Sequence, residues 1–176
     1  MKKIVIVCVV LAAVILGVAV VKWSLKKPAG PEQPIRPENL LVVTLYFGSR
    51  DGSALVSEER EIKASGAVLE DLKHVVEALI SGPASGQGAG LFPAGVSVRG
   101  VYINGKTAYI DFSRQVVDNF AGGSTAEYLL VASIVQTVCA DFPEVDSVAL
   151  LVDGEQVETI GGHLDASKVL RAKDWR

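Results

Sequence analysis

Hydrolytic chemistry would require a serine nucleophile, a histidine base and an acidic residue that orients the histidine. The chain has two histidines, and no serine lies in a G-x-S-x-G elbow between a strand and a helix. The residues that a triad would have to recruit are Ser113, Ser124, His74, His163, Asp111 and Asp165. Simpler roles are expected for them. His74 should lie on a charged, solvated helix surface, and His163 should donate to a backbone carbonyl or cap an element. Asp111 should accept bonds from the Ser113 to Gln115 N–H groups. We therefore predict that the protein is not an enzyme.

The segment Gly122-Gly123-Ser124-Thr125 stands before an apolar helical pattern and could bind an anion. Free N–H groups at a helix start, together with the helix dipole, favour a carboxylate or a phosphate. The alternative is a capping box, in which the Ser124 hydroxyl and the Glu127 carboxylate each accept a bond from the other residue's backbone N–H. We favour the capping box. The tentative ligand-binding residues are Gly122, Gly123, Ser124, Thr125 and His163.

The composition argues against several other kinds of site. Two histidines, two cysteines and no C-x-x-C or H-E-x-x-H pattern predict that there is no metal site and no cofactor. Cys8 lies in an apolar run and Cys139 in an expected helix, so we expect no disulfide between them. The net charge of -3, without a cluster of lysine and arginine, argues against nucleic-acid binding.

The residues considered above must be positioned by a β-hairpin and a helix. Apolar side chains alternate from Val96 to Ile103 and again from Lys106 to Phe112, which predicts two strands. Asn104-Gly105 between them predicts a type I′ turn. A helix with a broad apolar surface is expected from Ser124 to about Phe142.

The remaining elements complete a single α+β domain. Strands are expected over 40–47, 55–62, 145–152 and 156–160, with a helix over 68–80 and a tight Asp153-Gly154 turn. The order is ββαββαββ, with two helices packed on one face of a mainly antiparallel sheet. The strands that flank the second helix can be parallel, and the polar 55–62 strand should lie at a sheet edge. The glycine-rich segment 84–90 is expected to be a slack connection or a mobile loop at a binding edge.

The first 24 residues have the pattern of a transmembrane signal anchor. Ile4 to Val21 carries no charge, and as a helix it would span about 27 Å, close to the roughly 30 Å of a bilayer core. A cleaved signal peptide and a lipoprotein signal are the alternatives, but the run is long and Cys8 comes early. Lysines flank the run on both sides, so the charge pattern alone does not decide its orientation.

The anchor leads into a spacer and then the domain. Prolines recur every third residue from Pro28 to Pro37, which predicts an extended linker over 25–39. The folded domain is expected over 40–170, and the polar end of the chain, 171–176, is expected to fray.

Motifs along the domain form an ordered set. LFPAG at 91–95, Ile110-Asp111-Phe112-Ser113 and GGS at 122–124 followed by Glu127 come first. The later members are Thr137, Phe142-Pro143, Val145, Val148, Asp153-Gly154 and Gly161-Gly162-His163-Leu164. In this order and spacing they resemble the GerM-type sporulation and spore germination domain (GerMN domain). The resemblance implies a fold like that of the ring-building modules of sporulation and secretion channels, in an exported protein held at the cell envelope.

The combined prediction is a non-catalytic module in the cell (inner) membrane, with a single span and an extracytoplasmic C-terminal domain. Its expected partners are envelope proteins or a second copy of itself, and the bilayer through the N-terminal helix. The contact surface would be the 55–62 edge or the helix face around Glu70, His74 and Glu77. The alternative is a domain that binds a small ligand or a cell-wall fragment through the 84–92 loop, Gly122–Thr125 and His163.

Overall fold

The computed structural model describes residues 39–175, which belong to one compact unit, Glu38–Arg176. The expected signal anchor over 1–24 and the expected linker over 25–39, apart from its last residue, lie outside the described residues. Within 39–175, no helix combines the length and the apolar character that crossing a bilayer requires.

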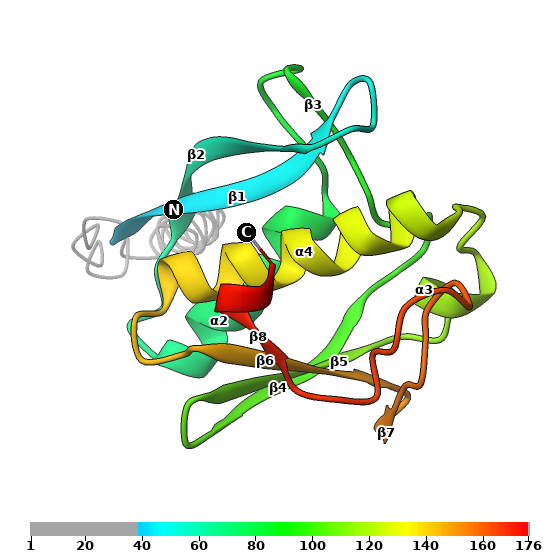
Figure 1. Ribbon diagram of the computed structural model, residues 1–176. Coiled ribbons are helices and arrows are strands. Elements are labelled where there is room, and N and C mark those ends of the chain that lie inside the picture. Colours follow the sequence, from blue (N-terminus) through cyan, green and yellow to red (C-terminus); the bar gives the residue numbers. More distant parts are fainter. Residues whose placement is uncertain (1–38, 176) are drawn as a thin grey trace, which may run out of the picture. The chain divides into compact units, whose positions relative to one another are not determined.

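The described chain has the α+β composition and the broad order of elements that the sequence predicts (Figure 1). Two helices dominate it, α2 and α4, and short elements that the sequence pattern did not indicate are added between and after them. In chain order the elements are β1 (Leu40–Ser49), β2 (Leu55–Lys63), α2 (Val68–Ile80), β3 (Gly88–Ala89), β4 (Val98–Asn104), β5 (Thr107–Phe112), α3 (Gln115–Asp118), α4 (Ser124–Asp141), β6 (Ser147–Val152), β7 (Glu155–Gln156), β8 (Leu170–Arg171) and the 3-10 helix η1 (Ala172–Asp174).

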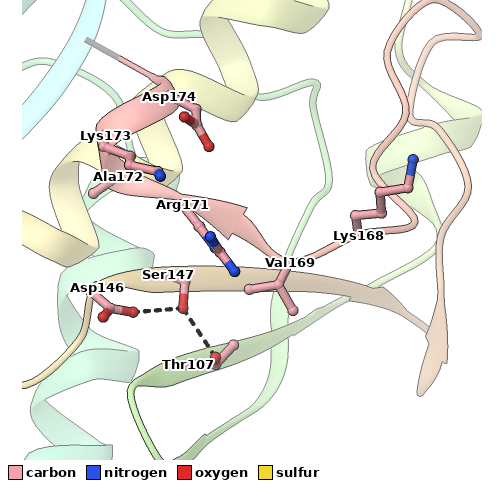
Figure 2. A pocket seen from close by; sticks show the side chains of 9 residues that line it. All are labelled: Thr107, Asp146, Ser147, Lys168, Val169, Arg171, Ala172, Lys173 and Asp174. Atoms are coloured by element: carbon pink, nitrogen blue, oxygen red, sulfur yellow. Dashed lines mark hydrogen bonds between the residues drawn. The ribbon is translucent and has the colours of Figure 1, made fainter.

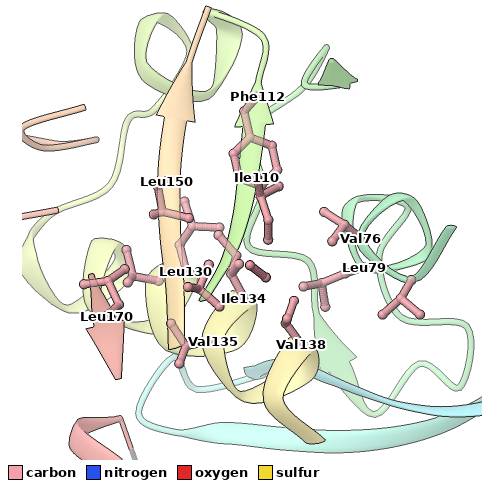
Figure 3. Close-up of a cluster of buried hydrophobic side chains, with 14 of the residues drawn as sticks. Val76, Leu79, Ile110, Phe112, Leu130, Ile134, Val135, Val138, Leu150 and Leu170 are labelled. Atoms are coloured by element: carbon pink, nitrogen blue, oxygen red, sulfur yellow. The ribbon is translucent and has the colours of Figure 1, made fainter. Parts of the chain in front are cut away.

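The strands form two sheets rather than the single sheet that we expected. One sheet has the order β2-β1-β3, and the other has the order β4-β5-β6-β7, with β8 also paired to β6. Figure 1 shows α4 and α2 between the β1–β2 hairpin above and the β4–β5–β6 strands below. The helices therefore bury apolar side chains against both sheets, and Figure 3 shows this core with Leu79 from α2, Ile134 from α4, and Ile110 and Leu150 from the larger sheet.

Pairing in the larger sheet agrees with the expected topology. Strands β5 and β6 are parallel and in register from Thr107 opposite Ser147 to Phe112 opposite Val152. The chain between them holds α3 and α4, as a connection between parallel strands requires. The other strand pairs in the described chain are antiparallel.

The two expected hairpin turns have different outcomes. The tight Asp153-Gly154 turn between β6 and β7 is confirmed, and the φ values of 54° and 85° at these two residues are those of a type I′ turn. In the β4–β5 hairpin, Asn104 pairs with Thr107, so the two loop residues are Gly105 and Lys106. Only Gly105 has a positive φ (60°), which is the pattern of a type II′ turn, so the predicted Asn104-Gly105 type I′ turn is wrong by one position.

Helix α4 is buried on nearly all sides, because it lies between the two sheets. Three polar side chains, four residues apart, make one stripe of this helix. The Tyr46 carbonyl of β1 accepts from Ser133 Oγ at 2.7 Å, and the Tyr46 N–H donates to Thr137 Oγ1 at 3.0 Å. The Thr44 N–H donates to Asp141 Oδ1 at 2.8 Å. These three side chains thus provide hydrogen bonds to the backbone groups at the edge of β1, which a neighbouring strand would otherwise provide.

The end of the chain does not fray as we expected. Strand β8 pairs with β6 at Val148 and Ser147, and η1 then brings Trp175 against α4. The Trp175 ring is 8% exposed and stacks on Tyr128 with 5.2 Å between ring centroids. The Gln136 side-chain amide also donates to the Trp175 carbonyl. Burial of one large aromatic residue therefore holds the polar terminus in place.

Candidate functional site

The predicted capping box at the start of α4 is wrong. The residue before the helix is Gly123, and no side chain caps the first turn. The Glu127 N–H donates to the Gly123 carbonyl at 3.0 Å rather than to the Ser124 hydroxyl. The Glu127 carboxylate points away from Ser124 and into the protein, because better donors lie there.

Glu127 is fully buried, and its carboxylate accepts four hydrogen bonds from one loop near the end of the domain. Oε1 accepts from Thr159 Oγ1 at 2.6 Å, the Ile160 N–H at 2.9 Å and the Gly161 N–H at 2.8 Å. Oε2 accepts from the His163 N–H at 2.9 Å. Burial raises the pKa of Glu127, but the hydrogen bonds from Gly161, Thr159, His163 and Ile160 outweigh it and hold the pKa below its ordinary value. Glu127 therefore fastens the 159–163 loop to α4 as a carboxylate.

The glycines around Glu127 are required by close packing against Phe120. A Cβ at Gly122 would lie 2.8 Å from Phe120 Cζ and 2.6 Å from the Ala126 Cβ. A Cβ at Gly161 would lie 2.5 Å from Phe120 Cε1. The GGS and GGHL motifs thus meet across one aromatic ring, although they stand almost forty residues apart.

The tentative ligand-binding residues lie close together in the structure, but some of them already form contacts within the domain. The His163 N–H is bound to Glu127, and Gly122 is packed against Phe120. Gly123, Ser124 and Thr125 are exposed. The pocket that includes His163, about 370 Å³, is shallow and is also lined by Thr159, Gly162 and Asp165. Ligand binding by these residues stays a prediction.

The residues that a catalytic triad would need form hydrogen bonds with other groups and not with one another. Within residues 39–175, neither histidine side chain is bonded to a serine or a carboxylate, and His74 is half-buried with its Nδ1 unpartnered. Asp111 Oδ1 accepts from the Gly154 N–H at 2.9 Å, so the expected bonds to the 113–115 backbone are not made. Ser113 Oγ accepts from the Ser97 N–H at 3.0 Å. These side chains join the hairpin to its neighbours.

The pKa values of Asp165 and Cys139 are shifted in opposite directions. Hydrogen bonds from Lys168 and Ser167 lower the pKa of Asp165 to about 2. Burial, with a smaller contribution from the charge of Asp146, raises the pKa of the free Cys139 thiol to about 11, so the thiol stays protonated at neutral pH. Among the described residues, no group of three or more His, Cys, Asp or Glu could hold a metal ion.

A large pocket lies at the β8 end of the larger sheet. It has a volume of about 1010 Å³ and is open to solvent (Figure 2). Ser147 Oγ lies 3.0 Å from Thr107 Oγ1 and 2.9 Å from Asp146 Oδ1, and Arg171 reaches towards them from β8. Its charged lining is mixed: Lys168, Arg171 and Lys173 against Asp146 and Asp174. This pocket does not involve the 84–92 loop or Gly122–Thr125.

The 84–90 segment is held in place by β2, so it is not the slack connection that we expected. Glu58 Oε2 accepts from the Ser85 N–H at 2.8 Å, and Glu58 also accepts from the Ala84 N–H at 3.1 Å. Arg60 forms an ion pair with Glu58 and donates to the Gly82 carbonyl at 2.8 Å. Burial raises the pKa of Glu58, but its bonds with Ser85, Arg60 and Ala84 outweigh this and lower it to about 2. Two charged residues on the inner face of β2 thus bind the loop after α2.

The outer edge of β2 is the clearest unpaired surface in the described domain. Strand β2 is nine residues long and pairs with β1 without a register shift, while β1 lies between β2 and β3. The Thr44 N–H points to α4 and away from β2, so Thr44 and its cross-strand neighbour Glu59 form a non-hydrogen-bonded pair. The N–H and C=O groups of Glu59 therefore point away from β1. The same holds for Ser57 and Glu61 by alternation. Within residues 39–175, these outward backbone groups have no hydrogen-bond partner.

The motifs and geometry above are shared with known domains. The model of the family Germane, "Sporulation and spore germination", matches residues 44–158, which is more than half of the chain. The chain belongs to this family. The resemblance that the motifs indicate is therefore confirmed, and the family is one of sporulation and germination domains rather than a known class of enzyme.

Solved structures show the same fold. The first GerMN domain of the sporulation protein GerM from Bacillus subtilis is 25% identical, with a TM-score of 0.63 over 76% of this chain and 99% of that chain. The tandem GerMN domains of GerM are 23% identical, with a TM-score of 0.63 over 77% of this chain and 48% of that chain, so this chain covers about half of the tandem. A protein described as a lipoprotein from Clostridium perfringens is 26% identical, with a TM-score of 0.57 over 77% and 90% of the two chains. No curated protein sequence matches the chain.

Proposed function

We propose that this Germane-family domain is a non-catalytic module that binds another protein at the cell envelope, and that the outer edge of β2 is its docking surface. The expected anchor over 1–24 would hold the chain in the membrane with the domain on the extracytoplasmic side. Similarity to a protein described as a lipoprotein supports an envelope location. The family membership supports a role in an assembly of the kind used in sporulation or germination.

The observation that carries this proposal is the contrast between the two long edges of the β1–β2 hairpin. The free side of β1 is covered by the Ser133, Thr137 and Asp141 side chains of α4 and by β3. The outer side of β2 has no such cover among the described residues, although β2 is nine residues long. An extended segment of a partner can add to such an edge through backbone hydrogen bonds.

The edge is also rigid and ready for pairing. The inner-face residue Arg60 of β2 bonds to the Ala78 carbonyl at 3.1 Å and the Gly82 carbonyl at 2.8 Å, and its guanidinium lies 5.6 Å from the Phe47 ring centroid. These contacts hold the strand against the end of α2. A docking strand would therefore meet a preformed template, which reduces the entropy lost on binding.

Site-specific photo-crosslinking of the full chain in its native membrane tests the proposal. A photoreactive residue at Ser57, whose backbone faces outward, should give an adduct with an envelope protein, and the same residue at exposed Ser167 in the loop before β8 should not. Glu59→Pro removes one outward N–H without removing a bond to β1, so it should weaken the Ser57 adduct while the melting temperature changes little. An absent adduct, or one that Glu59→Pro leaves unchanged, would overturn the proposal.

A further inference from the structure

We infer that the partner strand carries lysine or arginine at two alternate positions, i and i+2, and that it is not β2 of a second copy of this chain. This inference rests on the proposed function, because it concerns the strand that docks on the outer edge of β2. It adds the chemical character of the partner, which the edge itself specifies through the side chains that lie along it.

The side chains next to the open edge divide by face. Ser57, Glu59 and Glu61 have outward backbone groups, and their side chains are exposed on the outer face of the sheet. On the inner face, Glu58 and Arg60 already bind each other and the 82–85 backbone. The inner-face charges are therefore paired within the domain, and the acidic side chains available to a partner are those on the outer face.

Glu59 and Glu61 form an acidic pair on the outer face of β2, where Lys63 is the next residue of the strand. They are two residues apart on one face of one strand, and their cross-strand neighbours on β1 are Thr44 and Val42, which carry no charge. Within residues 39–175, neither carboxylate has an ion pair or a hydrogen bond. A strand added outside β2 would place its own side chains about 4.5–5.5 Å from these two. Basic residues there would gain attraction at both positions.

A second copy of β2 lacks the basic pattern at alternate positions, because its basic residues, Arg60 and Lys63, are three positions apart. When two β2 strands pair antiparallel about Arg60, Glu59 of each copy lies opposite Glu61 of the other. When they pair about Glu59, the two Glu59 side chains face each other. Like charges directly opposite in a sheet are destabilising. The acidic pair therefore opposes self-pairing in these two registers and favours a cationic partner strand.

Three synthetic nine-residue peptides provide the probes. The first alternates threonine and lysine, the second has glutamate in place of lysine, and the third is the lysine peptide with N-methyl groups along one backbone edge. Binding to the full chain in lipid nanodiscs at neutral pH is measured for the wild type, for Glu59→Lys/Glu61→Lys, and for Glu144→Lys/Glu155→Lys. The last variant is a matched control, because Glu144 and Glu155 are also exposed but lie beside the larger sheet.

The lysine peptide should bind the wild type and the control variant alike, and about tenfold more weakly to Glu59→Lys/Glu61→Lys. The glutamate peptide should show the reverse preference. N-methylation should abolish binding, because it removes the backbone donors that pair with β2. Equal binding of both charged peptides to the wild type, or unchanged binding after the charge reversal or after N-methylation, would overturn the inference.

The two proposals fail in distinguishable ways. If Ser57 crosslinks to an envelope protein through a segment without alternating basic residues, the docking edge stands and the partner chemistry is wrong. If that segment is β2 of a second copy, the inference is wrong in the same way. If Ser57 gives no adduct at all, the proposed docking function itself fails, whatever the peptides show.

Discussion

Glu127 shows how a residue that looks available for binding or catalysis can instead stabilise the fold. The sequence places it after a serine in a helix-start motif, where a reach back to the backbone is the usual role. In the structure its carboxylate accepts three backbone N–H groups and one hydroxyl from the 159–163 loop. Glu127 forms no ion pair among residues 39–175, so hydrogen bonds alone offset the cost of burying its charge.

Replacing Glu127 with glutamine should lower the free energy of unfolding by about 2–4 kcal/mol at neutral pH. The amide group would direct a donor at N–H groups that need an acceptor, and hydrogen bonds to a charged group contribute about 1.5–3 kcal/mol each. Urea unfolding followed by fluorescence measures the change. Glu144→Gln, at an exposed position, should shift the free energy by less than about 0.5 kcal/mol.

The same pair of variants has a defined pH dependence. Since the folded-state pKa of Glu127 lies below its ordinary value, its contribution to stability is complete above about pH 4.3 and is lost as the pH falls through the folded-state pKa. The difference between wild type and Glu127→Gln should therefore shrink in acid. A difference that stays constant from pH 7 to pH 3 would show that the carboxylate charge is not what holds the 159–163 loop.

At the scale of elements, sequence periodicity predicted the main helices and strands but not the division of the strands into two sheets. The α2 bounds, the β6–β7 turn and the parallel β5–β6 pair agree with the prediction, because local pattern and chain connection determine them. The single predicted sheet is wrong, because alternation shows that a strand has a buried face and does not show against which layer it packs. The loop over 84–90 could not be predicted either, since its order comes from Glu58 and Arg60 on a distant strand.

The polar stripe of α4 is the element-level feature that the sequence could have indicated. Ser133, Thr137 and Asp141 recur every four residues inside a helix that is otherwise apolar, which places them on one face. Buried polar side chains require partners, so this spacing indicates a bare backbone edge beside the helix. The edge is that of β1, at Thr44 and Tyr46.

Replacing Thr137 with valine should destabilise the domain by about 1–3 kcal/mol. Valine has almost the same shape, but it leaves the part-buried Tyr46 N–H without its acceptor at 3.0 Å. Chemical denaturation gives the free energy, and hydrogen exchange should show faster exchange of the Tyr46 amide in particular. Thr125→Val, at an exposed position of the same helix, should change neither quantity appreciably. Unchanged exchange at Tyr46 would mean that α4 does not protect the β1 edge.

At the scale of the whole molecule, α4 and β3 cover one edge of the β1–β2 hairpin and leave the outer edge of β2 unpaired among the described residues. Helix α4 is fastened at its start to the 159–163 loop by Glu127 and near its end to β1 by Asp141. The end of the chain returns to the same helix through Trp175. None of these contacts involves the outer edge of β2, which is the edge that we propose as the docking surface.

The two acidic anchors of α4 should give the whole domain an unusual stability profile. Burial raises the pKa of Asp141 to about 6, and the bond from the Thr44 N–H only partly offsets this. Asp141 Oδ2 is buried and has no partner among the described residues. Since the folded-state pKa is above the unfolded value of about 3.9, Asp141 favours the folded state below that value, and this contribution is lost as the pH rises through about 6. Glu127 acts in the opposite direction in acid, so the domain should be most stable between about pH 4 and pH 5.5.

Replacing Asp141 with asparagine tests this profile. The amide oxygen can still accept from the Thr44 N–H, and the buried charge is removed, so the variant should be more stable than the wild type by about 1–2 kcal/mol at pH 7.5. The gain should disappear near pH 4, where Asp141 is largely protonated in the folded protein. Denaturant unfolding from pH 4 to pH 8 measures both curves, with Asp118→Asn on exposed α3 as the control. If Asp141→Asn destabilised the domain at pH 7.5, the carboxylate would have to be a favourable anion there, and the wild-type curve should then show no fall between pH 5 and pH 7.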